Sequence, residues 1–281
     1  MDVEFKRPKH KKRRRWDIQT DKLKVYSEIK SARLSGVVFD TAVWLCVSSE
    51  TVKKLDSACF GNLDGGNGTA IFIKDSLKDV DVEIEGDKAV RLSLDEAFFM
   101  HYALRSLTLY TVRDKAGQPA RLLDTAEAWQ EMQNSKKDFI LLYLCYHHFR
   151  SKVRYFHAVM RLCRCPGHNC VMQLQGWIPR TGLQYGVDFV LYQKHPAITH
   201  SDYSVSIQTD ETPGLGSLSR PPMSWHDLQV TNRLTAQVGK RLLVARIHDP
   251  APHLGYDHPR CIDRVSISEM IVRRWVPESD R

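Results

Sequence analysis

The chain has 281 residues, of which 42% are hydrophobic and 26% are charged, and its formal net charge is +8. It contains no apolar run of membrane-spanning length and no signal-peptide pattern at its start, so we expect a soluble, intracellular protein that does not enter a membrane. Its seven cysteines follow no regular framework, which favours reduced thiols over a secreted disulfide scaffold. The length suits two domains of ordinary size.

The first residues hold most of the positive charge. Residues 1–15 contain eight Lys and Arg side chains and two acidic ones, a balance of +6 that leaves +2 for the other 266 residues. Because such a polar run cannot bury apolar surface, we predict a disordered basic arm over residues 1–17. It is interpreted as a nuclear-import signal, a phosphate-binding arm or both, and the alternative is a solvated tail without a role.

The next region, residues 18–112, is predicted to form a small α/β domain. It opens with an apolar and β-branched stretch at residues 34–47, and residues 50–59 have the spacing of a short amphipathic helix. A Gly-rich stretch at residues 61–68 is expected to interrupt regular structure.

The second part of this domain shows a strand pattern and a helix start. Residues 80–90 alternate between apolar and polar as in a strand. Ser93 is followed three residues later by Glu96, which is the pattern of a capping box, and an apolar run comes directly after it. Polar residues with Gly and Pro then predict a linker over residues 113–123.

A second α/β domain is predicted over residues 124–281. It begins with a helical pattern at residues 125–150, and residues 187–192 are apolar on nearly every position, as in a central strand. Residues 203–207 alternate as in a strand with one wet face.

The remaining elements of this domain are a helix and a strand. Helical spacing at residues 225–239 leads into a buried strand pattern at residues 242–245. A helix followed by two strands, a helix and a strand is a layered arrangement, so the predicted fold class is α/β (α+β).

Five sequence strings indicate more than a fold class. Each is weak alone, but together they follow one another in a consistent order and span most of the chain. They are residues 92–99 (LSLDEAFF), 146–152 followed by 176–177, 182–192 followed by 196 and 200–205, 238–243, and 273–278. On these strings the chain resembles the tRNA-splicing endonuclease family of eukaryotes, and the first and last favour the subunit that cuts the 5′ splice site.

The resemblance implies a fold, an activity and partners. The fold is a small N-terminal α/β domain followed by a restriction-endonuclease-like catalytic α/β domain. The activity is metal-independent and cofactor-free cleavage of intron-containing pre-tRNA, which releases the intron and leaves a 2′,3′-cyclic phosphate and a 5′-hydroxyl. The partners are a second catalytic subunit and two structural subunits in a heterotetramer, and the location is the nucleus.

The resemblance assigns catalysis to Tyr192, His200 and Lys240. A cyclic phosphate forms when the 2′-hydroxyl beside the cut loses a proton and attacks phosphorus, while the 5′-oxygen leaves and gains a proton. In the family pattern Tyr192 is the general base, His200 is the general acid and Lys240 stabilises the charge of the transition state. Histidine suits an acid at neutral pH, whereas a phenol needs a nearby cation or substrate positioning to act as a base.

The predicted elements allow these three residues to converge. Tyr192 ends one predicted strand, His200 precedes the next, and Pro196 between them disfavours a continuous strand. Lys240 lies where a predicted helix passes into a strand. Without the surrounding strings, each of them would be interpreted as a packing or surface residue.

The family pattern also marks Arg233 and Trp275 as RNA-binding residues. Their planar side chains would stack on a bulged base, each stack contributing about 1–3 kcal/mol. If the predicted helix continues, Arg233 lies two turns before Lys240 on the same face. The alternative is that Trp275 is a half-buried core residue and Arg233 a surface charge.

Residues 153–175 depart from the family pattern, which would join Lys152 directly to Gly176. Valine codons begin with GU and a glutamine codon can be CAG, so the segment has the ends of a translated, unspliced intron. We predict transcripts in which the two flanking codons are adjacent. A metal site in this segment is disfavoured, because the spacing matches no common zinc pattern. Its candidate ligands are Cys163, Cys165, His168 and Cys170.

Two other functions stay open at the level of sequence. One is a non-cleaving paralogue or misspliced isoform that acts only as an assembly subunit. The other is a DNA-binding or DNA-cutting protein, which the basic arm and a nuclease-type fold would allow. Such nucleases usually carry a carboxylate-rich metal site, and none is evident in the sequence, so this alternative is the weaker one.

Overall fold

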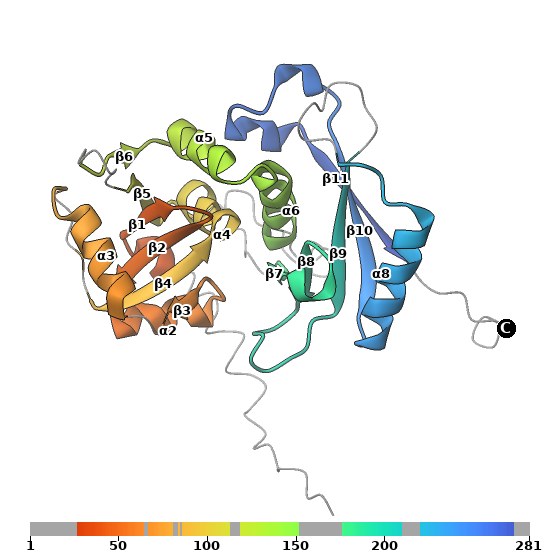
Figure 1. Ribbon diagram of the computed structural model, residues 1–281, viewed down its shortest axis with the longest axis horizontal. Helices are drawn as coiled ribbons and strands as arrows, with labels where there is room; N and C mark the ends of the chain where they lie inside the picture. Colours follow the sequence, from red (N-terminus) through yellow and green to blue (C-terminus); the bar gives the residue numbers. More distant parts are fainter. Residues whose placement is uncertain are drawn as a thin grey trace, which may run out of the picture.

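The computed structural model describes residues 27–64, 67–80, 84, 86–112, 119–151, 176–209 and 220–272. These residues form two β-sheets that lie side by side, with helices packed on both (Figure 1). The architecture is mixed α/β, so the fold class predicted from the sequence is confirmed. In this part of the chain, no helix is long and apolar enough to cross a membrane.

The first sheet has six strands in the order β3-β4-β2-β1-β5-β6. β1 and β5 run parallel, and all other neighbours are antiparallel. β1 and β2 are buried over most of their length, as expected for central strands covered on both faces. The strands are β1 (Leu34–Phe39), β2 (Ala42–Val47), β3 (Asn62–Asp64), β4 (Lys88–Ser93), β5 (Leu107–Thr111) and β6 (Leu122–Leu123).

Residues 27–31 are helical, and three further helices accompany this sheet. They are α2 (Ser49–Ser57), α3 (Asn67–Leu77) and α4 (Leu94–Phe98), which continues as the π-helical turn η1 (Phe99–Ala103). The Ser93 hydroxyl accepts a hydrogen bond from the Glu96 N–H, and the Glu96 carboxylate accepts one from the Ser93 N–H. The predicted capping box is therefore confirmed.

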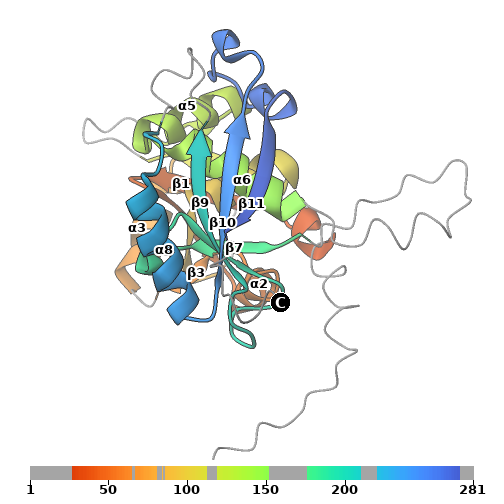
Figure 2. The same ribbon diagram turned by 90° about the vertical axis from the view of Figure 1, so that its right-hand side faces the viewer.

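The second sheet has five strands in the order β11-β10-β9-β8-β7. β9 and β10 run parallel, and the other neighbours are antiparallel. Helix α8 (Trp225–Gln237) lies in front of this sheet in Figure 2, and α6 (Phe139–Ser151) lies behind it. The strands are β7 (Ile178–Thr181), β8 (Phe189–Tyr192), β9 (Tyr203–Thr209), β10 (Arg241–His248) and β11 (Ser266–Val272).

The two halves share one hydrophobic core. Helix α5 (Thr125–Ser135) and α6 pack their aromatic side chains on α4, where the Phe98 ring is 5.0 Å from that of Trp129 and 4.9 Å from that of Tyr143. The buried Arg150 of α6 lies 4.5 Å from the Phe60 ring and donates a hydrogen bond of 2.5 Å to the Ala58 carbonyl. The position of the second sheet is thus fixed by contacts with the first. The short 3-10 turns are η2 (Leu183–Tyr185), η4 (Pro252–Leu254) and η5 (Pro259–Asp263).

Three element predictions are corrected by the structure. The helical pattern at 125–150 forms two helices, because the backbone is extended at Lys136 and ends α5 there. The Gly-rich stretch contains β3 and the start of α3, so it interrupts regular structure less than expected. The strand expected at 80–90 lies later, in β4, where it pairs with both β2 and β3.

Several predictions fall on residues outside those described. The basic arm over 1–17, the insertion over 153–175 and most of the linker over 113–123 belong to this group. The candidate metal ligands inside 153–175 lie outside the described residues as well. The boundaries proposed for the two domains therefore stay predictions.

Candidate active site

Tyr192 is the last residue of β8 and is half-buried. Its ring packs on a small apolar cluster that includes Val190 of β8 and Leu242 of β10. Leu228 of α8 packs on the same cluster, so the Tyr192 phenol lies on the face of the sheet that α8 covers. The opposite face carries Phe189 and belongs to the main core.

Lys240 lies between the end of α8 and the start of β10, as predicted. Its backbone N–H donates to the Thr235 carbonyl at 2.9 Å, and Gly239, with φ of 68°, supplies the left-handed turn that ends the helix. The side chain is buried, and its ammonium lies 4.5 Å from the centre of the Tyr185 ring. Because Tyr185 packs on the same apolar cluster as Tyr192, the ammonium and the phenol share one face of the sheet.

The loop that carries His200 is held between β8 and β10. The Asp202 N–H donates to the Leu191 carbonyl at 2.9 Å, and the Asp202 carbonyl accepts from the Arg241 N–H at 3.1 Å. His200 comes two residues before Asp202, and its side chain is exposed.

The main-chain positions of Tyr192, His200 and Lys240 are therefore close together, at the edge where β8 ends and where β9 and β10 begin. Among the described residues, no hydrogen bond or ion pair joins the three side chains directly. Their catalytic roles stay a prediction, which the backbone arrangement supports.

His195 connects the loop between Tyr192 and His200 to the other half of the molecule. Its Nδ1 accepts a hydrogen bond from the Ala197 N–H at 3.1 Å, which leaves Nε2 to donate to the Asp56 carbonyl at 2.9 Å. Asp56 belongs to the last turn of α2, and its carboxylate lies 3.5 Å from the same Nε2. No local sequence pattern indicates this contact, because its two residues are 139 positions apart.

Arg180 of β7 makes a second connection between the halves. Its guanidinium lies 2.8 Å from the Glu96 carboxylate and 3.3 Å from the Gly61 carbonyl. The Glu96 side chain is 5% exposed, and its other oxygen accepts from the Gly61 and Ser93 N–H groups. Glu96 was predicted only as a capping residue, and no local pattern indicates Arg180 as its partner.

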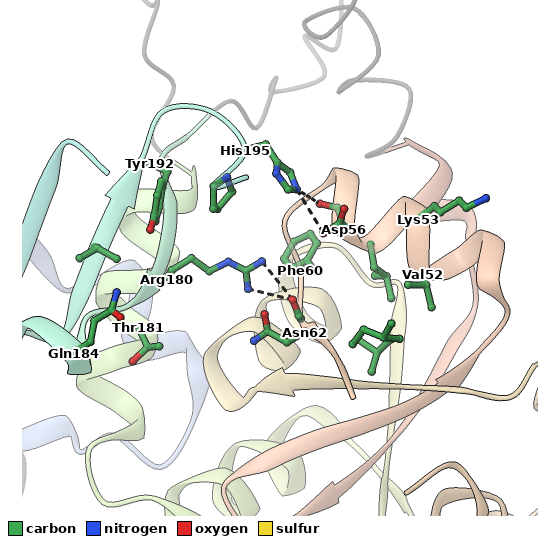
Figure 3. Close-up of a pocket in the computed structure, with 16 residues that line it drawn as sticks. Val52, Lys53, Asp56, Phe60, Asn62, Arg180, Thr181, Gln184, Tyr192 and His195 are labelled. Carbon is green, nitrogen blue, oxygen red and sulfur yellow. Dashed lines mark hydrogen bonds and ion pairs between the residues drawn. The ribbon is translucent and has the colours of Figure 1, made fainter. Parts of the chain in front are cut away.

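A cavity of about 600 Å³ lies between the two halves, beside Tyr192. Residues of α2 and β3 line one side, and residues of β7, β8 and the loop after β8 line the other (Figure 3). In this close-up the Tyr192 ring stands at the edge of the cavity, on the same side as Arg180 and Gln184. Among the described residues, no group of three or more His, Cys, Asp and Glu side chains could hold a metal ion.

Of the two predicted RNA-binding residues, Arg233 is the one that the structure describes. Arg233 is exposed on α8, which ends at Gln237, so the condition under which Arg233 and Lys240 would share one helix face is not met. The helix ends early because Gly239 turns the chain into β10. Trp275 lies outside the described residues.

The residues that flank the predicted insertion are close together. The Trp177 N–H donates to the Phe149 carbonyl at 2.9 Å, although the two residues are separated by the whole segment. A Cβ atom on Gly176 would lie 2.1 Å from the Arg150 carbonyl oxygen, so only glycine fits there. Described residues before and after the segment are thus in direct contact.

Known proteins of one family are similar to this chain in sequence. The model of the tRNA intron endonuclease catalytic C-terminal domain matches residues 171–251. The tRNA-splicing endonuclease subunit Sen2-1 of Arabidopsis thaliana is 31% identical over 263 residues, which cover 92% of this chain and 89% of that protein. The Sen2 subunits of Gallus gallus and Mus musculus are 34% and 32% identical over 194 residues. These 194 residues cover 68% of this chain and 35% of each vertebrate protein.

Proposed function

The chain belongs to the tRNA-splicing endonuclease family as a Sen2-type subunit, and on this premise we propose that it cuts intron-containing pre-tRNA at the 5′ splice site. The observation that supports this most is the arrangement of three strand ends. The end of β8 and the starts of β9 and β10 place Tyr192, the His200 loop and Lys240 beside one another. A base, an acid and a cation are the groups that cleavage by transesterification needs.

The proposed reaction forms and breaks one bond each at phosphorus. In its deprotonated form, Tyr192 takes the proton of the 2′-hydroxyl of the nucleotide before the cut, and the 2′-oxygen bonds to phosphorus. The bond to the 5′-oxygen of the next nucleotide breaks, and His200 gives that oxygen a proton. Lys240 stabilises the extra negative charge on the non-bridging oxygens. The products are a 2′,3′-cyclic phosphate and a 5′-hydroxyl, and the proton balance needs no cofactor.

Lys240 suits its role because it is already positioned without substrate. Its side chain is 8% exposed and lies on the Tyr185 ring, so little side-chain entropy remains to be lost when a phosphate binds. The ammonium also shares a sheet face with the Tyr192 phenol.

The proposed assembly is a heterotetramer with a second catalytic subunit and two structural subunits. The relatives from Arabidopsis thaliana and Gallus gallus are each named as a subunit of a tRNA-splicing endonuclease. Arg233 and Trp275 are proposed to stack on a bulged base of the pre-tRNA. The basic arm over residues 1–17 would support import into the nucleus, where we place the protein.

The proposal is tested with a reconstituted tetramer and an intron-containing pre-tRNA. We expect cleavage at the 5′ splice site, and we expect His200→Ala to slow it about 10²–10⁴-fold, the contribution of a general acid. The matched control is His253→Ala, because His253 is exposed and follows the opposite end of β10. The 3′ end of the product should resist phosphatase until the cyclic phosphate is opened by acid. Cleavage that survives in His200→Ala, or that leaves a 3′-hydroxyl, would contradict the mechanism.

The alternative is a misspliced isoform that assembles without cutting, and one feature favours it enough to be tested. The flanks of residues 153–175 already contact each other, so the segment is an addition to a fold that closes without it. A tetramer with these residues deleted should therefore assemble. If only the deleted form cleaves, the complete chain is the assembly-only isoform; if both cleave, the alternative is wrong. Sequenced transcripts that join the codons of Lys152 and Gly176 would support the origin as a retained intron.

A further inference from the structure

The cavity beside Tyr192 is lined by apolar, uncharged polar and charged residues. Its floor is apolar and is formed from both halves of the molecule by Leu55, Phe60, Val90 and Val190. Three exposed side chains at its mouth, Asn62, Thr181 and Gln184, carry uncharged donors and acceptors. Its volume of about 600 Å³ lies within the range of roughly 300–1,000 Å³ that small-ligand sites occupy.

These walls suit a nucleobase better than a simple anion. An apolar floor accepts the face of a base, and amide or hydroxyl groups can pair with its edge. The Arg180 guanidinium also faces the cavity, but its charge is balanced by Glu96 at 2.8 Å. Lys53 and Asp56, on α2, also line the cavity, and their opposite charges add no net charge to it. Recognition here would therefore depend on shape and hydrogen bonding more than on net charge.

The order of the strands indicates which nucleotide of the substrate could bind in the cavity. β8 lies between β9 and β7, so Lys240 at the start of β10 is on one side of Tyr192 and Arg180 of β7 is on the other. In the proposed reaction the scissile phosphate lies on the Lys240 side. Tyr192 contacts the 2′-hydroxyl of the preceding nucleotide, and the base of that nucleotide then extends away from the phosphate, toward β7.

We propose that this cavity binds the nucleotide immediately before the cut, whose 2′-hydroxyl attacks the phosphate. This assignment rests on the proposed function and extends it, because it makes α2 and β3 of the N-terminal half part of the substrate site. Asn62 and Gln184, on opposite sides of the cavity, pair with the edge of the base.

Photocrosslinking tests the assignment directly. The probe is pre-tRNA with 4-thiouridine at the nucleotide before the cut, bound to the tetramer that contains His200→Ala, so that cleavage at the 5′ splice site is slowed during the experiment. We expect crosslinks to peptides of residues 52–63 or 180–196. RNA with 4-thiouridine immediately after the cut is the control and should not crosslink to these peptides. Crosslinks of the first probe to other peptides would overturn the proposal.

Substitutions at the mouth of the cavity give a second readout. We expect Gln184→Ala and Asn62→Ala each to raise KM for pre-tRNA about fivefold with little change in kcat, whereas the exposed Gln130→Ala on α5 should change neither. Removing the base from the nucleotide before the cut should raise KM for the unaltered tetramer and cancel the effect of both substitutions. Effects that simply multiply would show that the cavity does not contact this base.

These outcomes separate the two proposals. If the unaltered tetramer does not cleave at the 5′ splice site, the proposed function fails. If it cleaves, but the crosslinks and the base removal point elsewhere, only the cavity assignment fails.

Discussion

The two faces of the five-stranded sheet are covered by helices of opposite character. On one face α6 is buried along most of its length and packs on the aromatic core shared with the first sheet. On the other face, Thr235 is the buried residue of α8, and Trp225 and Leu234 are 73% and 50% exposed. The candidate catalytic residues lie at the edge of this second face. We therefore expect the α6 side to support stability and the α8 side to carry the proposed chemistry.

The largest effect is expected for Lys240, which lies on the α8 side, where substitutions should affect activity more than stability. We expect Lys240→Ala to lower kcat about 10²–10³-fold, the effect of removing one group that stabilises transition-state charge. The melting temperature should change little, because the truncation removes a charge and leaves the apolar cluster intact. The exposed Lys78→Ala is the control. A large loss of stability with normal kcat would place Lys240 among the structural residues.

Arg180 lies where the two halves meet, so we expect its substitution to affect both stability and activity. Arg180→Ala leaves the buried Glu96 carboxylate without its cation, so we expect a loss of about 2–4 kcal/mol in the free energy of unfolding. Cleavage should also fall, because Arg180 lines the cavity beside Tyr192.

The ion pair of Arg121 and Glu127 provides the matched comparison for Arg180. It is largely exposed, so Arg121→Ala should cost no more than about 1 kcal/mol. Urea unfolding of both variants measures the difference. Equal losses would show that the pair between the halves contributes no more than a surface pair.

Asp95 is buried on the core side, so we expect its ionisation to make the free energy of unfolding depend on pH. Burial raises the pKa of this carboxyl to about 6, with a further contribution from Glu96, so the folded state binds its proton more tightly than the unfolded state. The resulting cost is absent below about pH 4, grows between pH 4 and 6, and is complete above pH 6. We therefore expect Asp95→Asn to stabilise the protein by roughly 1–3 kcal/mol at pH 7.5 and by little at pH 4.5.

Urea unfolding at the two pH values checks the Asp95 prediction. The control is Asp87→Asn, since Asp87 is exposed and should show no such dependence. A variant that is less stable than the original at pH 7.5 would show that the Asp95 carboxylate is stabilised by contacts that outweigh its burial.

His195 is expected to have the smallest effect, and two substitutions separate its two hydrogen bonds. Asn can replace Nδ1 as the acceptor for Ala197 but is too short to reach α2, whereas Gln can place a donor near the Asp56 carbonyl. If the contact with α2 positions the catalytic loop, Asn should lower kcat about fivefold, corresponding to roughly 1 kcal/mol for one hydrogen bond, and Gln should restore it. Equal activity of the Asn variant and the original chain would contradict this role.

Local patterns in the sequence predicted the parts of the fold that depend on neighbouring residues. The capping box of Ser93 and Glu96 needs only three positions of sequence, and the end of β8 at Tyr192 follows from an apolar run before a proline. The break after α5 was missed, because Lys136 is polar but compatible with a helix, and only packing of α5 and α6 on α4 sets the break.

The contacts that shape the candidate site could not be predicted from local sequence patterns. Arg180 meets Glu96 across 84 positions, and His195 meets Asp56 across 139. Both depend on how the two sheets are packed against each other, which no local spacing of residues encodes. For the same reason, the cavity beside Tyr192 was not expected from the sequence.

The hydrogen bond between Trp177 and Phe149 also shows how α6 would end in a shorter chain. If Lys152 were joined to Gly176, Trp177 would be the fifth residue after Phe149, and its N–H would close the loop of a Schellman cap. That motif has glycine at the position before the closing residue, and Gly176 is there, against the Arg150 carbonyl where no Cβ fits. One hydrogen bond of the C-terminal cap expected for a polypeptide 23 residues shorter is thus already present between two segments that are distant in the sequence.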